Sequence, residues 1–395
     1  MKIFAQQGYG PKDKLTTALS NSEIEGVILS PRYLKPQKLS DQIEQIAAHN
    51  GQAYMDPEWH AAIHLSHPMS NLGNLETWSY FTMPRRGQLI SGAAIPKVLE
   101  NSLQVQKELG LQEWIAPNVL IDNADSIETG ISLNFISRTK EASKRVGNAQ
   151  VFATLALSRD AILNTKGFQD IFDALTSIPT PPDGVYIVVG STSSSELRSD
   201  LYHPQVIAGW MYMNYALSIN GIRVMNGYCH LLTPLLGIAG AESCASGWHS
   251  GLRQFVLGRY VKTSSGGRQP AIHYISNALL SRIRQTDYLA FKRVVPEVAN
   301  SLPNDVFYNS SEPDRTLEAR QSWEALSALT QAYCSNDIER NIPDMDNHLT
   351  QAIQFWTKLA NFGLNNGAEA NLERLRAMKE GLALFTKWAE ISVDG

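Results

Sequence analysis

Acidic and imidazole side chains that could carry out acid–base chemistry crowd into MDPEWHAAIHLSH at residues 55–67. Asp56 alone could serve as a general base, and a carboxylate beside imidazoles also suits zinc, iron or manganese. The metal-ligand candidates are His60, His64 and His67, but their spacing matches no recognised metal motif. We therefore predict a catalytic Asp56 and no metal or other cofactor. A polar loop with surface histidines is the alternative interpretation of this stretch.

A second reactive stretch, GIAGAESCASGWHSGLRQF at residues 237–255, combines glycines with an acid, a thiol, a histidine and an arginine. Backbone amides at a helix start, together with Arg253, favour an anion such as phosphate. We predict His249 and Arg253 as anion contacts and Glu242 as an acid–base group or nucleophile. The alternative is a tight strand-to-helix turn, in which Cys244 is a small buried hydrophobic residue.

The segment that follows is basic, with eight lysines and arginines between Arg253 and Arg293 against the single acid Asp287. Such a stretch can follow a phosphate backbone, and counterion release would then make binding salt-dependent. The alternative is a solvated face paired with acids of the C-terminal segment, such as Asp344 and Glu373. The nucleic-acid-binding candidates are Arg259, Lys262, Arg268, Arg282 and Arg284.

The whole chain is mildly acidic, with a net charge of -4 and a pI of about 6.2. It is therefore no general attractor of nucleic acid or anionic membranes, and any such binding must be local. Three scattered cysteines make no disulfide framework and favour a reducing compartment. The opening residues lack the pattern of a signal peptide, and no apolar run is long enough to span a membrane. We expect a soluble cytoplasmic protein without a membrane partner.

Short apolar runs that alternate with helical patterns must position these groups. Nearly continuous apolar strands between helices predict a parallel sheet covered by helices. We predict an α/β fold of the (β/α)8 TIM-barrel type, with an open doubly wound sheet as the alternative. MKIFAQQ, at residues 1–7, is expected to be an extra strand on the barrel floor. The eight predicted strands are residues 26–30, 53–56, 114–122, 151–157, 184–190, 222–227, 239–245 and 271–275.

Beyond residue 295 the pattern becomes helical, with apolar residues at helical spacing such as Ile353, Trp356 and Leu359. We predict a barrel domain at 1–295 and a C-terminal helical region at 296–395. The helices are expected to pack against the barrel or against a protein partner.

In a barrel of this type, the active site lies at the carboxyl ends of the strands. Asp56, Asp122, Gly190 and Tyr228 all lie at or just after predicted strand ends. We predict Asp122, Gly190 and Tyr228 as substrate-binding residues, together with His249 and Arg253. An intact active site would require Asp56, Asp122, Glu242 and His249 to meet in one pocket.

Residues 53–253 resemble the barrel of tRNA-guanine transglycosylases and their DNA-modifying 7-deazaguanine relatives. The matching motifs are AYMD with Asp56, VLIDNAD with Asp122, PDGVYIVVG with Gly190, IRVMNGY, and GAESCAS. The resemblance implies a barrel that exchanges a base in nucleic acid, with Asp122 reading the base.

The sequence departs from that family at three places. Ala245 stands where the family has its nucleophilic aspartate, PEWH replaces a glycine-rich motif, and a cysteine-rich zinc subdomain has no counterpart. Because displacement at a glycosidic carbon needs an ionised nucleophile and a base, Glu242 or Asp56 would have to substitute.

We therefore expect a transglycosylase-like barrel protein that acts on or binds a nucleobase in nucleic acid, as a glycosyltransferase or glycosylase type of enzyme. One alternative is a non-catalytic subunit of a larger assembly, which binds nucleic acid through residues 253–293 and protein partners through the C-terminal helices. Another is a metal- or phosphate-dependent lyase or hydrolase that acts on a small metabolite.

Overall fold

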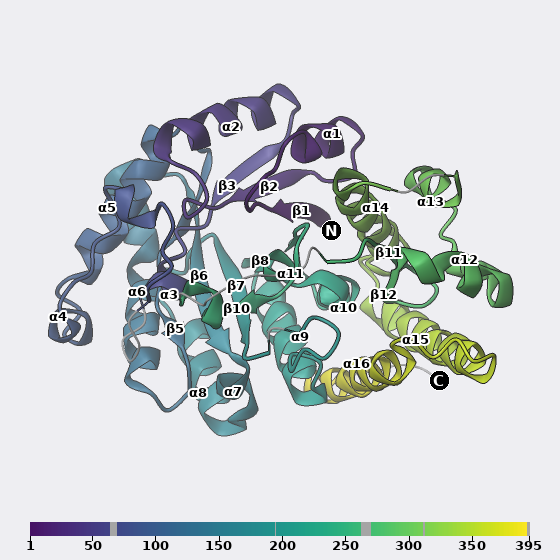
Figure 1. Ribbon diagram of the computed structural model, residues 1–395. Helices are drawn as coiled ribbons and strands as arrows, with labels where there is room; N and C mark the ends of the chain where they lie inside the picture. Colours follow the sequence, from purple (N-terminus) through teal and green to yellow (C-terminus); the bar gives the residue numbers. More distant parts are fainter. Residues whose placement is uncertain (64–68, 194, 262–269, 311–312, 393–395) are drawn as a thin grey trace.

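The computed structural model describes residues 1–63, 69–193, 195–261, 270–310 and 313–392. Among these residues, eight parallel strands form a nearly closed barrel with helices around it (Figure 1), in the order β3-β2-β1-β9-β8-β7-β6-β4. The predicted TIM-barrel-like α/β fold with a C-terminal helical segment is therefore confirmed. The barrel strands are β1 (Lys2–Gln6), β2 (Gly26–Leu29), β3 (Gln52–Met55), β4 (Glu113–Ala116), β6 (Gln150–Ser158), β7 (Gly184–Ser191), β8 (Arg223–Gly227) and β9 (Ser243–Ser246).

Helices follow most barrel strands and cover the outer face of the barrel. These are α1 (Lys14–Ser20), α2 (Pro36–Ala48), α5 (Ile95–Glu108), α6 (Ile127–Val146), α8 (Thr165–Thr176), α9 (Pro204–Ile219) and α10 (Thr233–Ile238). Shorter elements lie in the connections: α3 (Trp59–Ala62), α4 (Arg86–Ile90), β5 (Leu120–Ile121), α7 (Arg159–Leu163), α11 (Ser250–Arg253), β10 (Phe255–Val256), and the 3-10 turns η1 (Leu75–Thr77), η2 (His230–Leu232) and η3 (Leu257–Tyr260).

The barrel has one seam, between β3 and β4, where the described strands form no backbone pairing. Side chains bridge this seam, because the Tyr54 hydroxyl on β3 donates a hydrogen bond to Glu113 at the start of β4. Arg223, which opens β8, forms ion pairs with Glu113 and Glu242, and its guanidinium lies 4.8 Å from the Phe152 ring centroid. This charged cluster therefore closes the amino-terminal end of the barrel.

Two strand predictions were wrong. The segment at residues 1–7, predicted as an extra strand on the barrel floor, is β1, a full barrel strand. It pairs with β2 and with β9, so the first barrel strand in the sequence lies beside the last one. The predicted eighth strand at 271–275 is instead β11 (His273–Ser276), which pairs antiparallel with β12 (Ser281–Arg284) outside the barrel. A four-residue turn is too short for a parallel crossover, so this strand pairs with its nearest neighbour in sequence.

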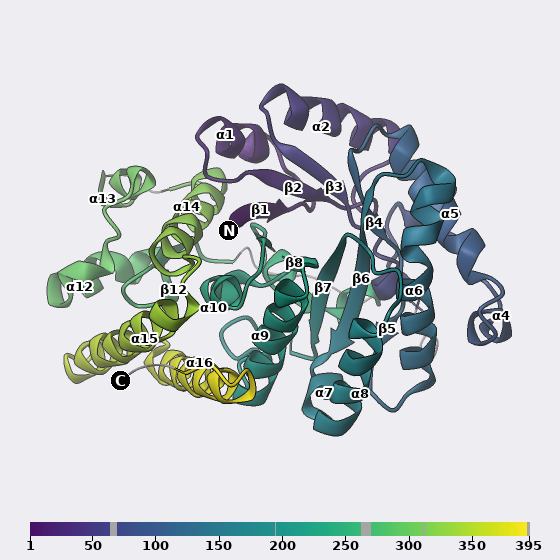
Figure 2. The same ribbon diagram turned by 180° about the vertical axis from the view of Figure 1, so that it is seen from behind.

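The C-terminal helices pack along the barrel on the side of α9, α10 and β1 (Figure 2). Trp356 and Leu359 are buried and Ile353 is partly buried, as the helical spacing predicts. Tyr215 of α9 contacts Phe385 with ring centroids 5.9 Å apart. The domain boundary at residue 295 stays a prediction. The elements of this region are α12 (Gln285–Val294), η4 (Pro296–Val298), η5 (Pro303–Asp305), α13 (Val306–Ser310), α14 (Arg315–Tyr333), α15 (Ile338–Asn361) and α16 (Ala368–Trp388).

No helix in the described part of the chain is long and apolar enough to cross a membrane.

Side chains that alternate along the strands fill the barrel interior. Phe4, Ile28, Phe152, Tyr186 and Ala245 belong to one buried cluster there. Gly227 on β8 allows Tyr186 of β7 to lie across the interior, because a Cβ at Gly227 would overlap the Tyr186 hydroxyl. The interior is thus a packed core, and the site chemistry must lie at its rim.

We predict that Gly227→Ala lowers the free energy of unfolding by about 1–3 kcal/mol, because the added methyl group overpacks the barrel interior. Gly190→Ala on the neighbouring strand is the matched control, since a Cβ there would meet its nearest atom at an ordinary 3.5 Å. Urea denaturation of both variants measures the difference. Equal stabilities of the two variants would contradict this account of the interior.

Candidate functional site

Two acidic residues, Asp56 and Glu58, directly follow β3 and are separated in the chain by one residue. Asp56 Oδ1 accepts a hydrogen bond of 2.8 Å from the backbone N–H of Glu58, and Asp56 Oδ2 accepts one of 3.1 Å from the Tyr186 hydroxyl. Both acidic residues are almost completely buried, at 0% and 1% exposed. The end of β3 therefore places a carboxyl pair at the carboxyl-terminal mouth of the barrel.

Hydroxyl groups from two other segments hold the Glu58 carboxylate. Ser30, which follows β2, donates to Glu58 Oε1, and the Tyr260 hydroxyl at the end of η3 donates to Oε2 over 2.9 Å. The guanidinium of Arg32 stacks over the Tyr260 ring at 4.1 Å from its centroid. Glu58 is therefore joined through Tyr260 to a cationic side chain nearer the surface.

Burial changes the protonation of this pair. It raises the pKa of Asp56 to about 6. Burial and the neighbouring Asp56 charge raise the pKa of Glu58 to about 7, although its hydrogen bonds with Ser30 and Tyr260 act in the opposite direction. Carboxyl groups with these pKa values gain and lose a proton near neutral pH, as general acids and bases require.

His60 lies beside the pair, with Nδ1 3.8 Å from Asp56 Oδ1. Burial lowers the pKa of His60 to about 4, so the imidazole is neutral at pH 7. Its Nε2 has no hydrogen-bond partner among the described residues. His64 and His67 lie outside the described residues, and within those residues no group of three or more side chains is arranged to hold a metal ion.

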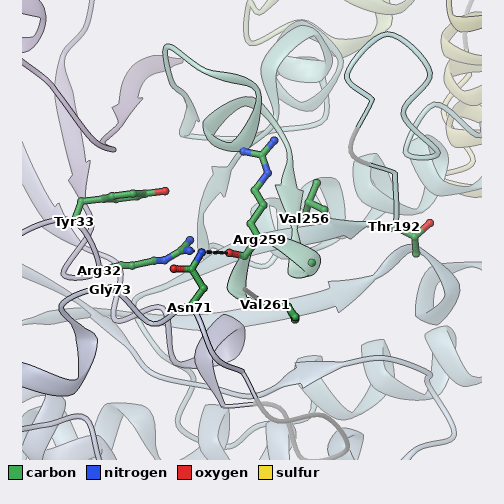
Figure 3. A pocket seen from close by; sticks show the side chains of 9 residues that line it. Arg32, Tyr33, Asn71, Gly73, Thr192, Val256, Arg259 and Val261 are labelled. Carbon is green, nitrogen blue, oxygen red and sulfur yellow. Dashed lines mark hydrogen bonds between the residues drawn. The ribbon is translucent and has the colours of Figure 1, made fainter. Parts of the chain in front are cut away.

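An open pocket of about 600 Å³ lies next to this network. The backbone carbonyl of Arg259 anchors one wall, because Arg32 Nη2 donates to it over 2.7 Å and Asn71 Nδ2 over 2.9 Å (Figure 3). The Arg259 side chain extends away from that contact, and its Nη2 donates to Ser250 Oγ over 3.0 Å. The pocket is lined by Arg32, Tyr33, Asn71, Gly73, Thr192, Val256, Gly258, Arg259 and Val261.

Strained backbone also marks this end of the barrel. Glu58, Tyr228 and His230 adopt positive φ angles of 52°, 57° and 35°, and all three are buried. Such conformations cost about 1–3 kcal/mol each in residues other than glycine, and they gather at functional sites. Two strand ends, those of β3 and β8, thus carry strained buried residues at the barrel mouth.

Glu242 lies at the other end of the barrel. It directly precedes β9, where Arg223 Nε contacts its Oε2 over 2.6 Å, and this hydrogen bond and charge lower the pKa of Glu242. Glu242 and Asp56 therefore do not meet in one pocket, which was the condition for an active site built from both. Ala245 is packed inside the barrel. The neighbouring Cys244 is also buried, which agrees with the alternative interpretation of it as a small buried hydrophobic residue.

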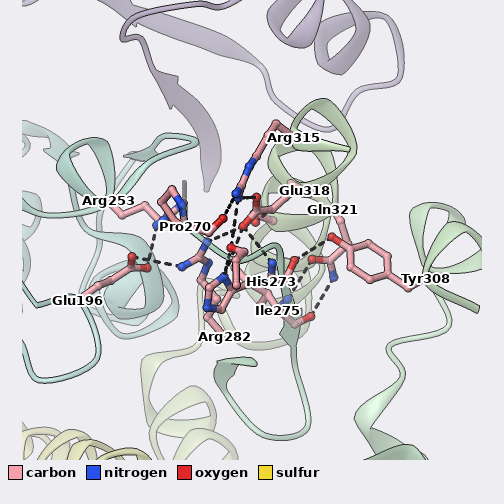
Figure 4. A network of polar contacts seen from close by, with 12 residues as sticks. Glu196, Arg253, Pro270, His273, Ile275, Arg282, Tyr308, Arg315, Glu318 and Gln321 are labelled. Atoms are coloured by element: carbon pink, nitrogen blue, oxygen red, sulfur yellow. Dashed lines mark hydrogen bonds and ion pairs between the residues drawn. The ribbon is translucent and has the colours of Figure 1, made fainter. Parts of the chain in front are cut away.

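Two of the predicted basic contacts form ion pairs with acids from distant segments. Arg253 Nε lies 2.7 Å from Glu196 Oε1, and Arg282 contacts both Glu196 and Glu318 (Figure 4). Glu318 belongs to the C-terminal helical region, so Arg282 does pair with an acid of that region, whereas Asp344 pairs with Arg340 of its own helix. Arg259 lines the pocket and Arg284 is exposed, whereas Lys262 and Arg268 lie outside the described residues.

The remaining predicted residues are dispersed around the barrel mouth. Tyr228 packs on Phe255 with ring centroids 5.7 Å apart, and Gly190 pairs with Phe255 in the β7–β10 ladder. Asp122 follows β5, and its backbone carbonyl accepts a hydrogen bond from Ser158. Burial and the nearby arginines lower the pKa of His249 to about 3, so it is a neutral side chain.

The sequence prediction omits Glu58, Arg32, Tyr186 and Tyr260 from the site. Glu58 and Arg32 each follow a predicted strand by two positions, so the position of each after a strand end could have identified them. Tyr186 lies within an apolar strand and Tyr260 within the basic stretch. Nothing local in the sequence indicates that their hydroxyl groups reach the carboxyl pair.

No protein-family model matches the chain, and no curated protein matches it. Among solved structures it is similar to the carboxyl transferase domain of Rhizobium etli pyruvate carboxylase with pyruvate and biocytin, at a TM-score of 0.36 and 9% identity. A tyrosine-to-alanine variant of that domain with pyruvate matches at a TM-score of 0.33 and 10% identity. Both matches cover 100% of this chain but only 61% and 62% of the matched chains. At these values the similarity carries no argument about function, and none of these findings supports the transglycosylase resemblance.

We predict that the contribution of Glu58 to stability falls as pH rises from about 4.5 to about 7. Unfolded Glu58 loses its proton near its ordinary pKa of 4.5, whereas folded Glu58 keeps it until about pH 7, so the folded state binds more protons between these values. Glu58→Gln should remove up to about 3 kcal/mol of this decline. Urea denaturation at several pH values measures it.

The matched control for this titration is Glu373→Gln, an exposed acid on α16. It should leave the dependence of stability on pH as in the wild type. A Glu58→Gln variant with an unchanged pH dependence would show that Glu58 is ionised throughout this range.

Proposed function

We propose that the protein is an acid–base enzyme that binds a phosphate-bearing substrate in the pocket of Arg32 and Arg259 and exchanges a proton with it through Asp56 and Glu58. The observation that carries this proposal is a carboxyl pair with pKa values of about 6 and 7 directly behind a cationic pocket. Perturbed carboxyl groups beside a cleft are a recurrent feature of active sites.

The pocket has the chemistry of an anion site. Arg32 and Arg259 bring two guanidinium groups to its walls, and Asn71 adds an amide. Guanidinium groups match the geometry of phosphate oxygens and remain charged at all relevant pH values. A volume of about 600 Å³ lies within the range of small-molecule and cofactor sites. Nucleotide-sized ligands therefore fit the pocket in both charge and size.

Tyr260 separates the pocket from the carboxyl pair. Its hydroxyl donates to Glu58, while its ring lies against Arg32 at the pocket wall. An anion that draws the Arg32 guanidinium away from the Arg259 carbonyl would release one face of that ring. In this proposal, substrate binding therefore moves Tyr260 and gives the substrate access to Glu58.

The narrower form of the proposal is glycosidic or base-exchange chemistry on a nucleobase in nucleic acid. Asp56 follows a barrel strand, as the transglycosylase resemblance implies, although this is the third barrel strand and not the second, and the pocket suits a backbone phosphate. Because Glu242 lies at the far end of the barrel, Glu58 is the second carboxylate that such a reaction needs. Arg284 is exposed and lies outside the pocket, so in this proposal it makes at most a weak contact with the flanking backbone.

A second candidate function is binding without turnover. The complete burial of Asp56 and Glu58 favours it, because no described cavity reaches either carboxyl group. In that case the barrel would hold a phosphate-bearing ligand or nucleic acid as a subunit of a larger assembly.

We predict that the purified protein releases or exchanges a base in DNA or RNA oligonucleotides, and that Asp56→Asn and Glu58→Gln each slow this reaction by at least about 100-fold. Chromatography of released base measures the rate. Glu242→Gln should retain the wild-type rate within about threefold, since its carboxylate lies at the other barrel end.

Activity that is unchanged in both Asp56→Asn and Glu58→Gln would remove the carboxyl pair from the mechanism. If no oligonucleotide releases a base, the narrower proposal of glycosidic or base-exchange chemistry is contradicted. Binding without turnover would then explain the structure better.

We also predict that Arg259→Met weakens the binding of a phosphorylated oligonucleotide at least about tenfold, because it removes a charge-assisted contact. Arg284→Met, which removes an exposed arginine outside the pocket, should weaken it by less than about threefold. Fluorescence anisotropy at constant salt measures both dissociation constants. Equal losses in the two variants would place the binding surface along the basic stretch instead of in the pocket.

A further inference from the structure

A second cavity, of about 250 Å³, lies where the C-terminal helices meet the barrel. Its walls come from the loop after β7, from η2, from the β11–β12 hairpin and from α16. It shares no lining residue with the pocket of Arg32 and Arg259. The lining residues are Ser195, Glu196, Leu197, Tyr202, His230, Leu231, His273, Arg282 and Arg374.

Arg374 on α16 is the least compensated charge in this cavity. It is only 4% exposed, and its Nη2 donates to the Leu280 carbonyl over 2.7 Å and to Ser281 Oγ over 2.6 Å. Its Nε has no acceptor, and in the described part of the chain no carboxylate forms an ion pair with it. The charge of Glu196 acts on Arg374 only from beyond ion-pair distance, and a buried guanidinium without an ion pair is costly, so the cavity that it lines favours an anion.

Arg282 adds a second incompletely paired cation. Its Nη1 lies 3.3 Å from Glu196 and its Nη2 contacts Glu318, but its Nε has no acceptor among the described residues. Both carboxylates are shared, Glu196 with Arg253 and Glu318 with Arg315 (Figure 4). Together with Arg374, four guanidinium groups therefore face two carboxylates, which leaves two positive charges in excess.

The imidazole at the cavity wall is a hydrogen-bonding group and not a further charge. Burial lowers the pKa of His230 to about 4, so the ring is neutral at pH 7. Its Nε2 lies 3.1 Å from Glu196 Oε1, whereas its Nδ1 has no hydrogen-bond partner among the described residues. A ligand in the cavity could hydrogen-bond with this unpartnered ring nitrogen.

The geometry points to a second anion site in this cavity, in which Arg374 and Arg282 hold one phosphate or carboxylate group of a small ligand. The volume of about 250 Å³ exceeds that of one oxyanion, since a water molecule in the liquid occupies about 30 Å³. A small organic phosphate or carboxylate is therefore the ligand class. Its binding would tie α16, which carries Arg374, to β12, which carries Arg282.

Arg374 also has a structural role, because it holds the turn between β11 and β12 through Leu280 and Ser281. That role alone predicts lower stability on substitution but no response to anions. The two roles are therefore separated by the dependence of stability on anion concentration.

The test is thermal denaturation of the full chain in inorganic phosphate and in acetate, each at constant ionic strength with chloride. We expect a saturable rise in Tm with one of these anions, and which one identifies the ligand group. In an Arg32→Met background, which alters the first pocket, Arg374→Met should abolish the remaining saturable rise. Arg374→Lys, which keeps the charge and supports folding, should raise the apparent Kd at least tenfold.

Two control variants isolate the site. Arg376→Met removes an exposed arginine of the same helix, and Arg32→Met alters the other pocket. Both should keep a saturable response. The inference is overturned if neither anion gives a saturable rise, if both Arg374 variants respond like the wild type, or if the response is lost in Arg32→Met. The last outcome would assign the anion to the first pocket and leave the proposed function intact.

Discussion

Hydrogen bonds from Tyr186, Tyr260 and Ser30 to two buried carboxyl groups are the interaction on which the barrel mouth depends. These hydroxyls come from β7, η3 and the end of β2, so the network joins segments that are far apart in the sequence. Without these donors, burying Asp56 and Glu58 would cost several kcal/mol. The same burial keeps both pKa values close to neutral pH. Packing of the mouth and the proposed acid–base chemistry thus have one physical origin.

Much of the fold is predictable from local pattern, because a strand covered on both faces must be apolar throughout. That pattern identified β2, β3, β4, β6, β7, β8 and β9, and with them the barrel class, although the single strand predicted at 114–122 is two strands, β4 and β5. It misjudged β1 and β11, since periodicity shows that a segment is a strand but not which strand it pairs with. β1 closes the barrel against β9, which begins more than two hundred residues later, and β11 pairs across a short turn.

The site was less predictable, for a related reason. Asp56 followed from the rule that barrel chemistry lies at strand ends, and the same rule could have selected Glu58. Glu242 was misplaced because the predicted strand began four residues before β9 does, which moved this acid from the amino end to the carboxyl end. The ion pairs of Arg253 and Arg282 with Glu196 join residues 57 and 86 positions apart, and no local pattern reports such contacts.

The central claim is that Asp56 and Glu58 hold a proton near neutral pH. The most direct measurement is infrared or NMR titration of carboxyl-labelled aspartate and glutamate, compared between the wild type, Asp56→Asn and Glu58→Gln. The account predicts two coupled titrations with apparent pKa values of about 6 and about 7, both altered by either substitution. Titration of every carboxyl group below about pH 5 would contradict it.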